Sequence, residues 1–148
     1  MPIADQVTEQ MKQAMKAKDE RRLVALRSMR SAFLNEMKKD GSASVSDAIC
    51  EGLLRKLEKQ RKESIEAFSN AGREELAAAE RAELSVIQEF LPKLADEAKT
   101  REWIDAAIAQ SGAASVKDVG KVMGALMKAH KGEIDGDLAR RIAQERLA

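Results

Sequence analysis

Residues able to carry out covalent chemistry are rare in this sequence of 148 residues, which has one cysteine, Cys50, and one histidine, His130. These two cannot form a disulfide or a four-ligand zinc site, and a Cys–His pair would have no further histidine to orient it. Cys50 falls on an apolar helical stripe, which is typical of a small core residue rather than of a thiolate nucleophile. No phosphate-binding or dinucleotide-binding glycine motif is present. We therefore expect no metal and no cofactor.

Two polar clusters could also suggest a catalytic group. The serines at positions 42, 44 and 46 lie in a turn without surrounding glycines, which is typical of a loop followed by a helix N-cap. The second cluster consists of four glutamates in one predicted helix, Glu74, Glu75, Glu80 and Glu83. We interpret them as the solvated face of that helix rather than as a metal or acid–base site. The sequence therefore predicts no catalytic residues and no enzymatic activity of the chain alone.

These side chains must be positioned by helices. Alanine occurs 25 times, whereas valine, isoleucine and threonine together occur 17 times, so good helix formers dominate. Apolar residues recur at helical spacing, and the resulting prediction is an all-α fold. The expected helices cover about 3–18, 19–40, 46–70, 73–91, 96–111, 115–130 and 137–147.

Side-chain caps are expected at three helix starts. Asp19 and Ser46 precede the second and third helices, and Ser115 with Asp118 has the spacing of a capping box. The apolar faces place most large hydrophobic residues inward, including Met15, Leu34, Ile49 and Leu76. One apolar line is interrupted at Gln60 and Arg61, so the third helix is either solvated there or buries a polar group with a partner.

Pro92 is the best domain boundary, because the residue before a proline is pushed out of the helical region. We expect an N-terminal domain of long helices over 1–92 and a small C-terminal three-helix bundle over 93–148.

The net charge of +1 conceals strongly charged segments. Residues 12–39 carry nine basic and three acidic side chains, whereas residues 63–91 carry seven glutamates against two arginines. Either basic and acidic helices pair across the bundle, or the basic helices form a face that binds phosphates. The candidate secondary basic face consists of Arg21, Arg22, Arg27, Arg30, Arg55, Lys59, Arg61 and Lys62.

The helix over 115–130 is the most informative segment. Gly120 and Gly124 lie on one face, and each costs the helix about 1 kcal/mol relative to alanine. They allow another backbone to approach, either a neighbouring helix in the bundle or a nucleic-acid backbone. The basic residues nearby, which could face water or bind RNA phosphates, are Lys117, Lys121, Lys128, Lys131 and His130. His130 would be a surface residue favoured by the helix dipole, or a phosphate contact.

The start of the chain lacks the pattern of a signal peptide, and no window has the apolar length of a membrane span, so we expect a cytoplasmic protein. Aromatic residues make up 3% of the sequence, which leaves little for stacking single-stranded bases. If the chain binds RNA, it should recognise shape and phosphates.

Several segments resemble the GatB/YqeY family. They are residues 59–68 (KQRKESIEAF), 71–73 (AGR), 90–92 (FLP), 120–127 (GKVMGALM) and 131–136 (KGEIDG). The chain is most similar to the small YqeY-like bacterial proteins, and its C-terminal half resembles the tail domain of the B subunit of the tRNA-dependent amidotransferase. This resemblance implies an all-helical fold in two parts and contact with tRNA, but not the chemistry, which in that enzyme belongs to other domains.

Three functional hypotheses follow. The chain could be a non-catalytic accessory that binds tRNA or another structured RNA in tRNA-dependent amidation. It could instead be a helical adaptor that docks on an amidotransferase or tRNA synthetase. Carbon–nitrogen ligase activity with glutamine as amide donor is the third, and it rests on the family resemblance alone.

Overall fold

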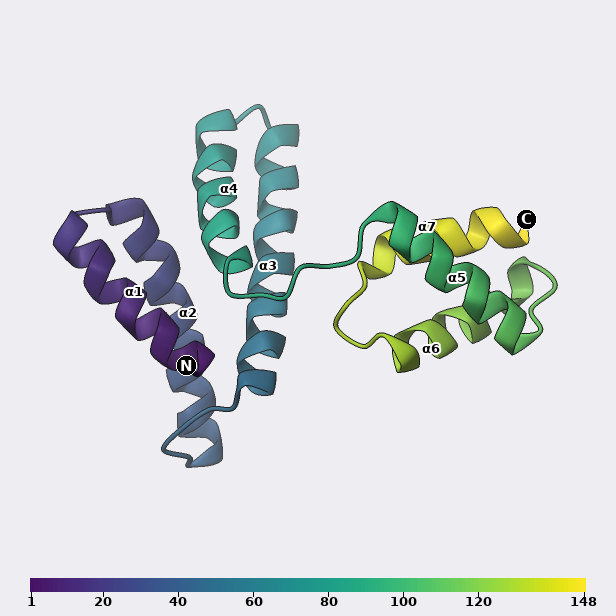
Figure 1. Ribbon diagram of the computed structural model, residues 1–148. Helices are drawn as coiled ribbons and strands as arrows, with labels where there is room; N and C mark the ends of the chain where they lie inside the picture. The colour runs from purple at the N-terminus through teal and green to yellow at the C-terminus, as the bar shows by residue number, and fades with distance from the viewer. The chain divides into compact units, whose positions relative to one another are not determined.

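The computed structural model describes residues 1–148 and contains helices and loops without strands, which confirms the all-α prediction. The helices are α1 (Ile3–Ala17), α2 (Glu20–Asp40), α3 (Asp47–Asn70), α4 (Glu74–Gln88), α5 (Glu97–Ser111), α6 (Val119–Ala129) and α7 (Gly136–Leu147), with a 3₁₀ turn η1 (Val116–Asp118) before α6 (Figure 1). The chain forms two compact units, unit 1 over 1–91 and unit 2 over 92–148. None of the helices has the length and apolarity needed to cross a membrane.

The predicted caps of the second and third helices are confirmed. The Asp19 carboxylate accepts a hydrogen bond from the backbone N–H of Arg22 at 3.2 Å. Ser46 Oγ accepts one from the N–H of Ile49 at 3.3 Å. These bonds satisfy N–H groups that have no partner within the helix, so they set where α2 and α3 begin.

The fourth helix ends earlier than the sequence predicts. We expected it to continue to residue 91, just before Pro92, but α4 ends at Gln88. From Glu89 to Leu91 each backbone N–H bonds to the carbonyl three residues earlier, so the last turn before the proline is tightened.

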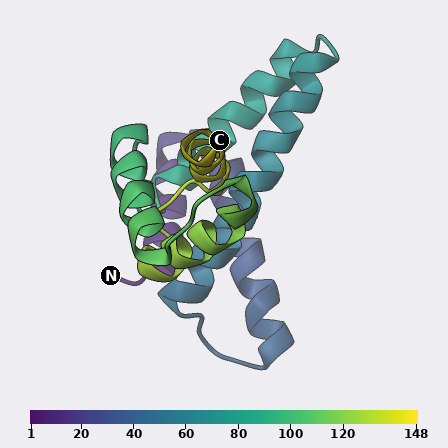
Figure 2. The same cartoon turned by 90° about the vertical axis from the view of Figure 1, so that its right-hand side faces the viewer.

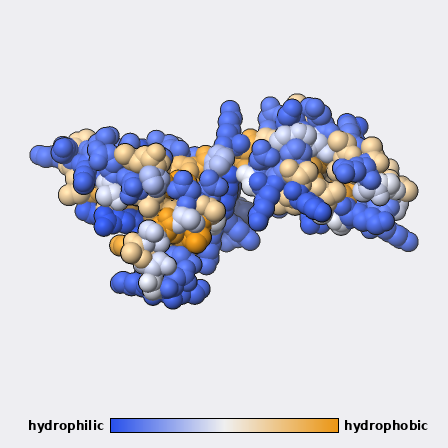
Figure 3. Space-filling model, turned by 60° about the horizontal axis from the view of Figure 1, so that its bottom comes forward, coloured by the Kyte–Doolittle hydropathy of each residue, from blue (hydrophilic) through white to orange (hydrophobic).

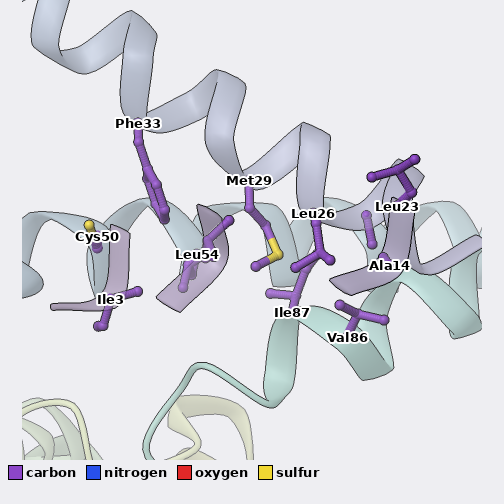
Figure 4. Packing of buried hydrophobic residues seen from close by; sticks show 12 residues of the cluster. Ile3, Ala14, Leu23, Leu26, Met29, Phe33, Cys50, Leu54, Val86 and Ile87 are labelled. Carbon is purple, nitrogen blue, oxygen red and sulfur yellow. The ribbon is translucent and has the colours of Figure 1, made fainter. Parts of the chain in front are cut away.

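The core of unit 1 lies between the α1–α2 pair and the antiparallel α3–α4 pair (Figure 1 and Figure 2). Leu26, Met29, Leu54 and Ile87 are fully buried there and point toward one another (Figure 4). Cys50 is also fully buried in this core, as the apolar stripe predicted (Figure 4).

Four residues predicted to face inward are exposed instead. The exposed fractions are 56% for Met15, 38% for Leu34, 41% for Ile49 and 37% for Leu76. Leu34 and Ile49 are direct neighbours of the buried Phe33 and Cys50, and one residue along a helix rotates the side chain by about 100°. The buried side of these helices is therefore narrower than the apolar face that the sequence predicts.

Unit 2 has its own core, in which Ile104, Val122, Leu126 and Ile142 from α5, α6 and α7 are buried. Thr100 is also fully buried, and its hydroxyl donates to the Asp96 carbonyl at 2.6 Å. The start of unit 2 is tied to the α6–α7 loop, because the N–H of Ala95 donates to the Glu133 carbonyl at 2.8 Å.

Candidate nucleic-acid interface

Four lysines and two glycines recur along the exposed side of η1, α6 and the loop that follows. We call this set the α6 stripe, and it consists of Lys117, Gly120, Lys121, Gly124, Lys128 and Lys131. All six residues are exposed. The opposite side of the helix carries Val119, Val122, Met123 and Leu126, which are buried. The amphipathic pattern of α6 therefore places the α6 stripe toward solvent.

Gly120 and Gly124 do not pack against another helix. A Cβ atom built on either residue would meet no atom within 4 Å. The interpretation that these glycines serve close packing in the three-helix bundle is therefore wrong. Their cost of about 1 kcal/mol each in helix propensity is not balanced by packing within this chain. The exposed backbone at these positions leaves room for the close approach of a partner.

The segment leading into α6 is held by Asp118. Its Oδ2 accepts hydrogen bonds from the N–H of Ala114 at 2.9 Å and of Ser115 at 3.3 Å, and the predicted capping box is present. The first turn is 3₁₀ rather than α, so α6 begins at Val119. The two backbone hydrogen bonds lower the pKa of the Asp118 carboxyl, and the nearby Lys121 acts in the same direction.

His130 lies at the C-cap of α6, as the sequence predicts, but it is half-buried and not a free surface residue. Its ring stacks on Trp103 of α5 with 3.7 Å between the centroids and 6° between the planes. Its Nδ1 also lies 3.3 Å from Glu133 Oε2. Trp103 and His130 are 27 positions apart in the sequence, so no local pattern predicted this contact. Among the predicted RNA contacts, His130 is therefore the one that the fold already engages.

A shallow depression lies beside the stripe. It has a volume of about 370 Å³ and is lined by Met123, Gly124, Met127, Gly136, Asp137 and Arg140. Arg140 of α7 is exposed and adds a cation that we did not predict. It lies four residues after the start of α7, so only the packing of α7 against α6 brings it near Gly124.

Three members of the secondary basic face are engaged within unit 1. Arg22 binds both carboxylate oxygens of Glu89, at 2.7 and 3.3 Å. Arg55 lies 3.3 Å from Glu58, a buried glutamate that also accepts a hydrogen bond from Gln88 at 3.2 Å. The third is Arg61. Arg22 and Arg61 pair with glutamates of α4 or its C-terminal end, as the hypothesis of paired basic and acidic helices predicts, whereas Arg55 pairs within α3. These three arginines do not form a free phosphate-binding face.

Arg61 explains the polar interruption in the third helix. Its Nε lies 2.7 Å from Glu83 and 3.4 Å from Glu80, and its Nη2 donates to Ser28 Oγ at 3.3 Å. The prediction that Glu80 and Glu83 lie on a solvated face is wrong, because both are half-buried and face α3 as the carboxylate partners of Arg61. Glu74 and Glu75 are exposed. The other members of the secondary basic face, all exposed, are Arg21, Arg27, Arg30, Lys59 and Lys62, although Lys59 and Lys62 lie on a different helix from the three arginines.

The structure offers no activated nucleophile at Cys50. Burial raises the pKa of its thiol, and the neighbouring charge of Asp47 adds to this effect. A raised pKa reduces the thiolate fraction, which is the reactive form. No group of three histidine, cysteine or acidic side chains is arranged to hold a metal ion.

Fold and surface define a small all-α protein of two helical units, one of which exposes a basic helix. The sequence matches the model of the Yqey-like protein family over residues 4–147, and the chain belongs to this family. The GatB/YqeY resemblance is thereby confirmed.

Curated relatives come from fungi and are named "Altered inheritance of mitochondria protein 41, mitochondrial". The protein of Saccharomyces cerevisiae is 36% identical over 84 residues, which cover 57% of this chain and 45% of the relative. The protein of Pyrenophora tritici-repentis is 28% identical over 138 residues, which cover 91% of this chain and 75% of the relative. The chain thus spans less than half the length of the yeast relative.

Proposed function

We propose that this protein binds tRNA or another structured RNA through the α6 stripe, as a non-catalytic accessory of tRNA-dependent amidation. The observation that carries the proposal is the combination of four exposed lysines with two glycines whose exposed face is unobstructed. Lysines on phosphates supply the sequence-independent part of RNA affinity. The glycines let the phosphate backbone come close to the helix.

The local charges favour an anionic partner. Asp118 is the acidic residue within η1 and α6, and it is engaged in capping hydrogen bonds. Lys117, Lys128 and Lys131 form no ion pair within the chain, whereas Lys121 lies near enough to Asp118 to help lower the pKa of its carboxyl. In the depression beside Gly124, α7 adds one cation, Arg140, and one carboxylate, Asp137.

The mode of recognition that we propose is contact with phosphates and shape. Trp103 is the one tryptophan of the chain, and His130 covers one face of its ring. Base stacking on the face of Trp103 that His130 covers would require the His130 ring to move. Recognition through the shallow surface of a folded RNA requires no such platform.

The link to amidation and the compartment rest on family membership. We propose the cytoplasm of a bacterium as the site of action, as the resemblance to YqeY-like proteins implies. The names of the curated relatives contain the word mitochondrial. If this protein acts in the same compartment as their names state, it would bind RNA in the mitochondrion. Immunofluorescence or fractionation of the source cells distinguishes the two.

The proposal is tested by tRNA binding. A four-lysine variant with Lys117, Lys121, Lys128 and Lys131 changed to glutamate should lose tRNA affinity. In the unmodified protein log Kd should change with log salt with a slope of about 3, for about four neutralised phosphates. A matched control changes four exposed lysines elsewhere, at positions 12, 16, 56 and 93, and should keep most of the affinity. Equal loss in both variants would reject the stripe as the binding surface.

The two alternatives predict different results. If the protein is a glutamine-dependent ligase, the pure protein should hydrolyse glutamine, and Cys50→Ala should abolish this activity. The burial of the Cys50 thiol and its raised pKa do not favour this hypothesis. The adaptor hypothesis requires an apolar docking surface, because protein interfaces concentrate apolar residues at their centre. The α6 stripe, rich in lysine, is not such a surface, so an adaptor would have to use another face of the protein.

A further inference from the structure

Unit 1 contains an open groove that RNA binding through the α6 stripe does not use. The groove has a volume of about 640 Å³ and lies between the first turns of α1, the second half of α2 and the α2–α3 loop. Its apolar lining includes Ala4, Phe33, Leu34, Met37 and Val45. Pockets of about 300–1,000 Å³ with such a lining are typical of binding sites.

Apolar side chains in this groove are open to solvent. Leu34 is 38% exposed although the helix pattern predicted it to be buried, and Met1 at the edge is 78% exposed. Figure 3 shows hydrophobic residues gathered on this end of unit 1 and surrounded by hydrophilic ones. A concentrated apolar patch with a polar rim is characteristic of an interaction site.

The charges at the rim indicate what kind of partner fits. Arg30 and Leu34 line the groove, and Arg27 and Lys38 lie one turn before and one turn after them on the same face of α2. The three cations are exposed and form no ion pair within the chain. The opposite wall carries two carboxylates: Asp47, whose Oδ1 accepts the N–H of Ile3 at 2.9 Å, and Asp5, which is exposed. The three cations of α2 outnumber Asp5, the one carboxylate of that wall that is not engaged. The α2 side of the groove therefore offers unpaired positive charge next to apolar surface.

We propose that this groove docks an amphipathic helix of a partner protein, with apolar residues in the groove and acidic residues facing Arg27, Arg30 and Lys38. Docking of an amphipathic helix into an apolar groove is a recurring mode of peptide recognition. The α2 segment from Arg30 to Met37 is about 10 Å long and matches about two turns of the bound helix. RNA is a poorer fit, because the exposed leucine and methionine would be covered by phosphates and sugars.

The test uses two synthetic helical peptides and the full chain. Both have leucine at positions i, i+3, i+4 and i+7 on an alanine background, and they differ only in flanking glutamates or flanking lysines. Binding is measured by chemical-shift perturbation of ¹⁵N-labelled protein. The glutamate peptide should bind with a Kd on the order of 100 μM, at least about fivefold tighter than the lysine peptide. Shifts should concentrate at the groove.

Matched variants locate the site. Leu34→Gln should weaken binding of the glutamate peptide about tenfold, because it removes an apolar contact. Leu76→Gln changes a leucine of α4 with nearly the same exposed fraction, 37%, and should leave the affinity unchanged. Arg30→Glu should reverse the preference between the peptides, whereas Arg73→Glu, an exposed arginine outside the groove, should not. Circular dichroism checks that each variant is folded.

Several results would overturn the proposal. They are the absence of saturable binding, equal binding of the two peptides, or equal loss in the Leu34 and Leu76 variants. If tRNA displaces the peptide and itself perturbs the chemical shifts of the groove residues, the groove is part of the RNA-binding surface. A dimer that dissociates in Leu34→Gln would make it a self-association interface. The four-lysine variant of the α6 stripe should bind the glutamate peptide normally, which separates this proposal from RNA binding.

Discussion

Arg61 of α3 places its Nε 2.7 Å from Oε2 of Glu83 in α4. The same guanidinium contacts Glu80 at 3.4 Å and donates to Ser28 of α2 at 3.3 Å, so one side chain connects three helices. About a fifth of each of the three charged side chains is exposed. Removing one member of a largely buried charge cluster leaves the others without a partner, which is more costly than losing a surface ion pair.

We predict that Arg61→Ala lowers the free energy of unfolding by about 2 kcal/mol, a value below that of fully buried pairs because the cluster is partly hydrated. Denaturant unfolding monitored by circular dichroism measures the change. Arg73→Ala, an exposed arginine outside the ion pairs, serves as control and should change stability by less than about 0.5 kcal/mol. In a double-mutant cycle with Glu83→Gln, additive effects would show that the two residues do not interact.

Gly120→Ala and Gly124→Ala should each raise the free energy of unfolding by about 0.5–1 kcal/mol, because a Cβ meets no atom there and alanine favours the helix. If RNA approaches the α6 stripe closely, the same variants should weaken tRNA binding. Gly52→Ala is the control, since Gly52 also lies within a helix, in α3, with free space around its Cβ. It should raise stability without affecting tRNA. A gain in stability with unchanged tRNA affinity in all three variants would show that the α6 glycines are not at the interface.

Asp118 should make the stability of unit 2 dependent on pH. Its pKa is lower in the folded protein because the N–H groups of Ala114 and Ser115 bind the charged carboxylate. Its contribution is therefore present above the ordinary carboxyl pKa and is lost as the pH falls through the lowered value. Asp118→Asn should lower the melting temperature at pH 7 and have a smaller effect at about pH 2.5. The same decrease at both pH values would contradict this assignment.

The stack of His130 on Trp103 should be visible in fluorescence, because Trp103 is the one tryptophan of the chain. His130→Ala uncovers a face of the indole and should shift its emission to longer wavelength. It should also lower stability by about 0.5–1.5 kcal/mol through loss of the ring contact. His130→Phe keeps an aromatic ring in place and should retain most of both properties. An unchanged spectrum in His130→Ala would mean that the rings are not stacked in solution.

The helical character of the protein could be predicted from local sequence. The evidence for helices is the alanine content, the apolar spacing and the caps Asp19 and Ser46. The spacing and the caps involve residues three or four positions apart, so they can be recognised in the sequence without knowledge of the fold. The exposure of the α6 stripe could be predicted for the same reason, since the opposite face is apolar. Two helix ends were misplaced. The end of α4 differs because the tightened turn before Pro92 depends on how the chain leaves unit 1, and the start of α6 differs because the first turn after Ser115 is 3₁₀.

The sequence by itself thus determined the all-α class, the position of most helix ends and the solvent-facing lysines of α6, since each depends on interactions between near neighbours in the chain. The tertiary structure alone decided which arginines are paired, that Gly120 and Gly124 face open space, that His130 covers Trp103 and that Leu34 lines an exposed groove. These contacts join residues far apart in sequence. Helical periodicity specifies the direction of a side chain relative to its own helix, but not the neighbour that it meets.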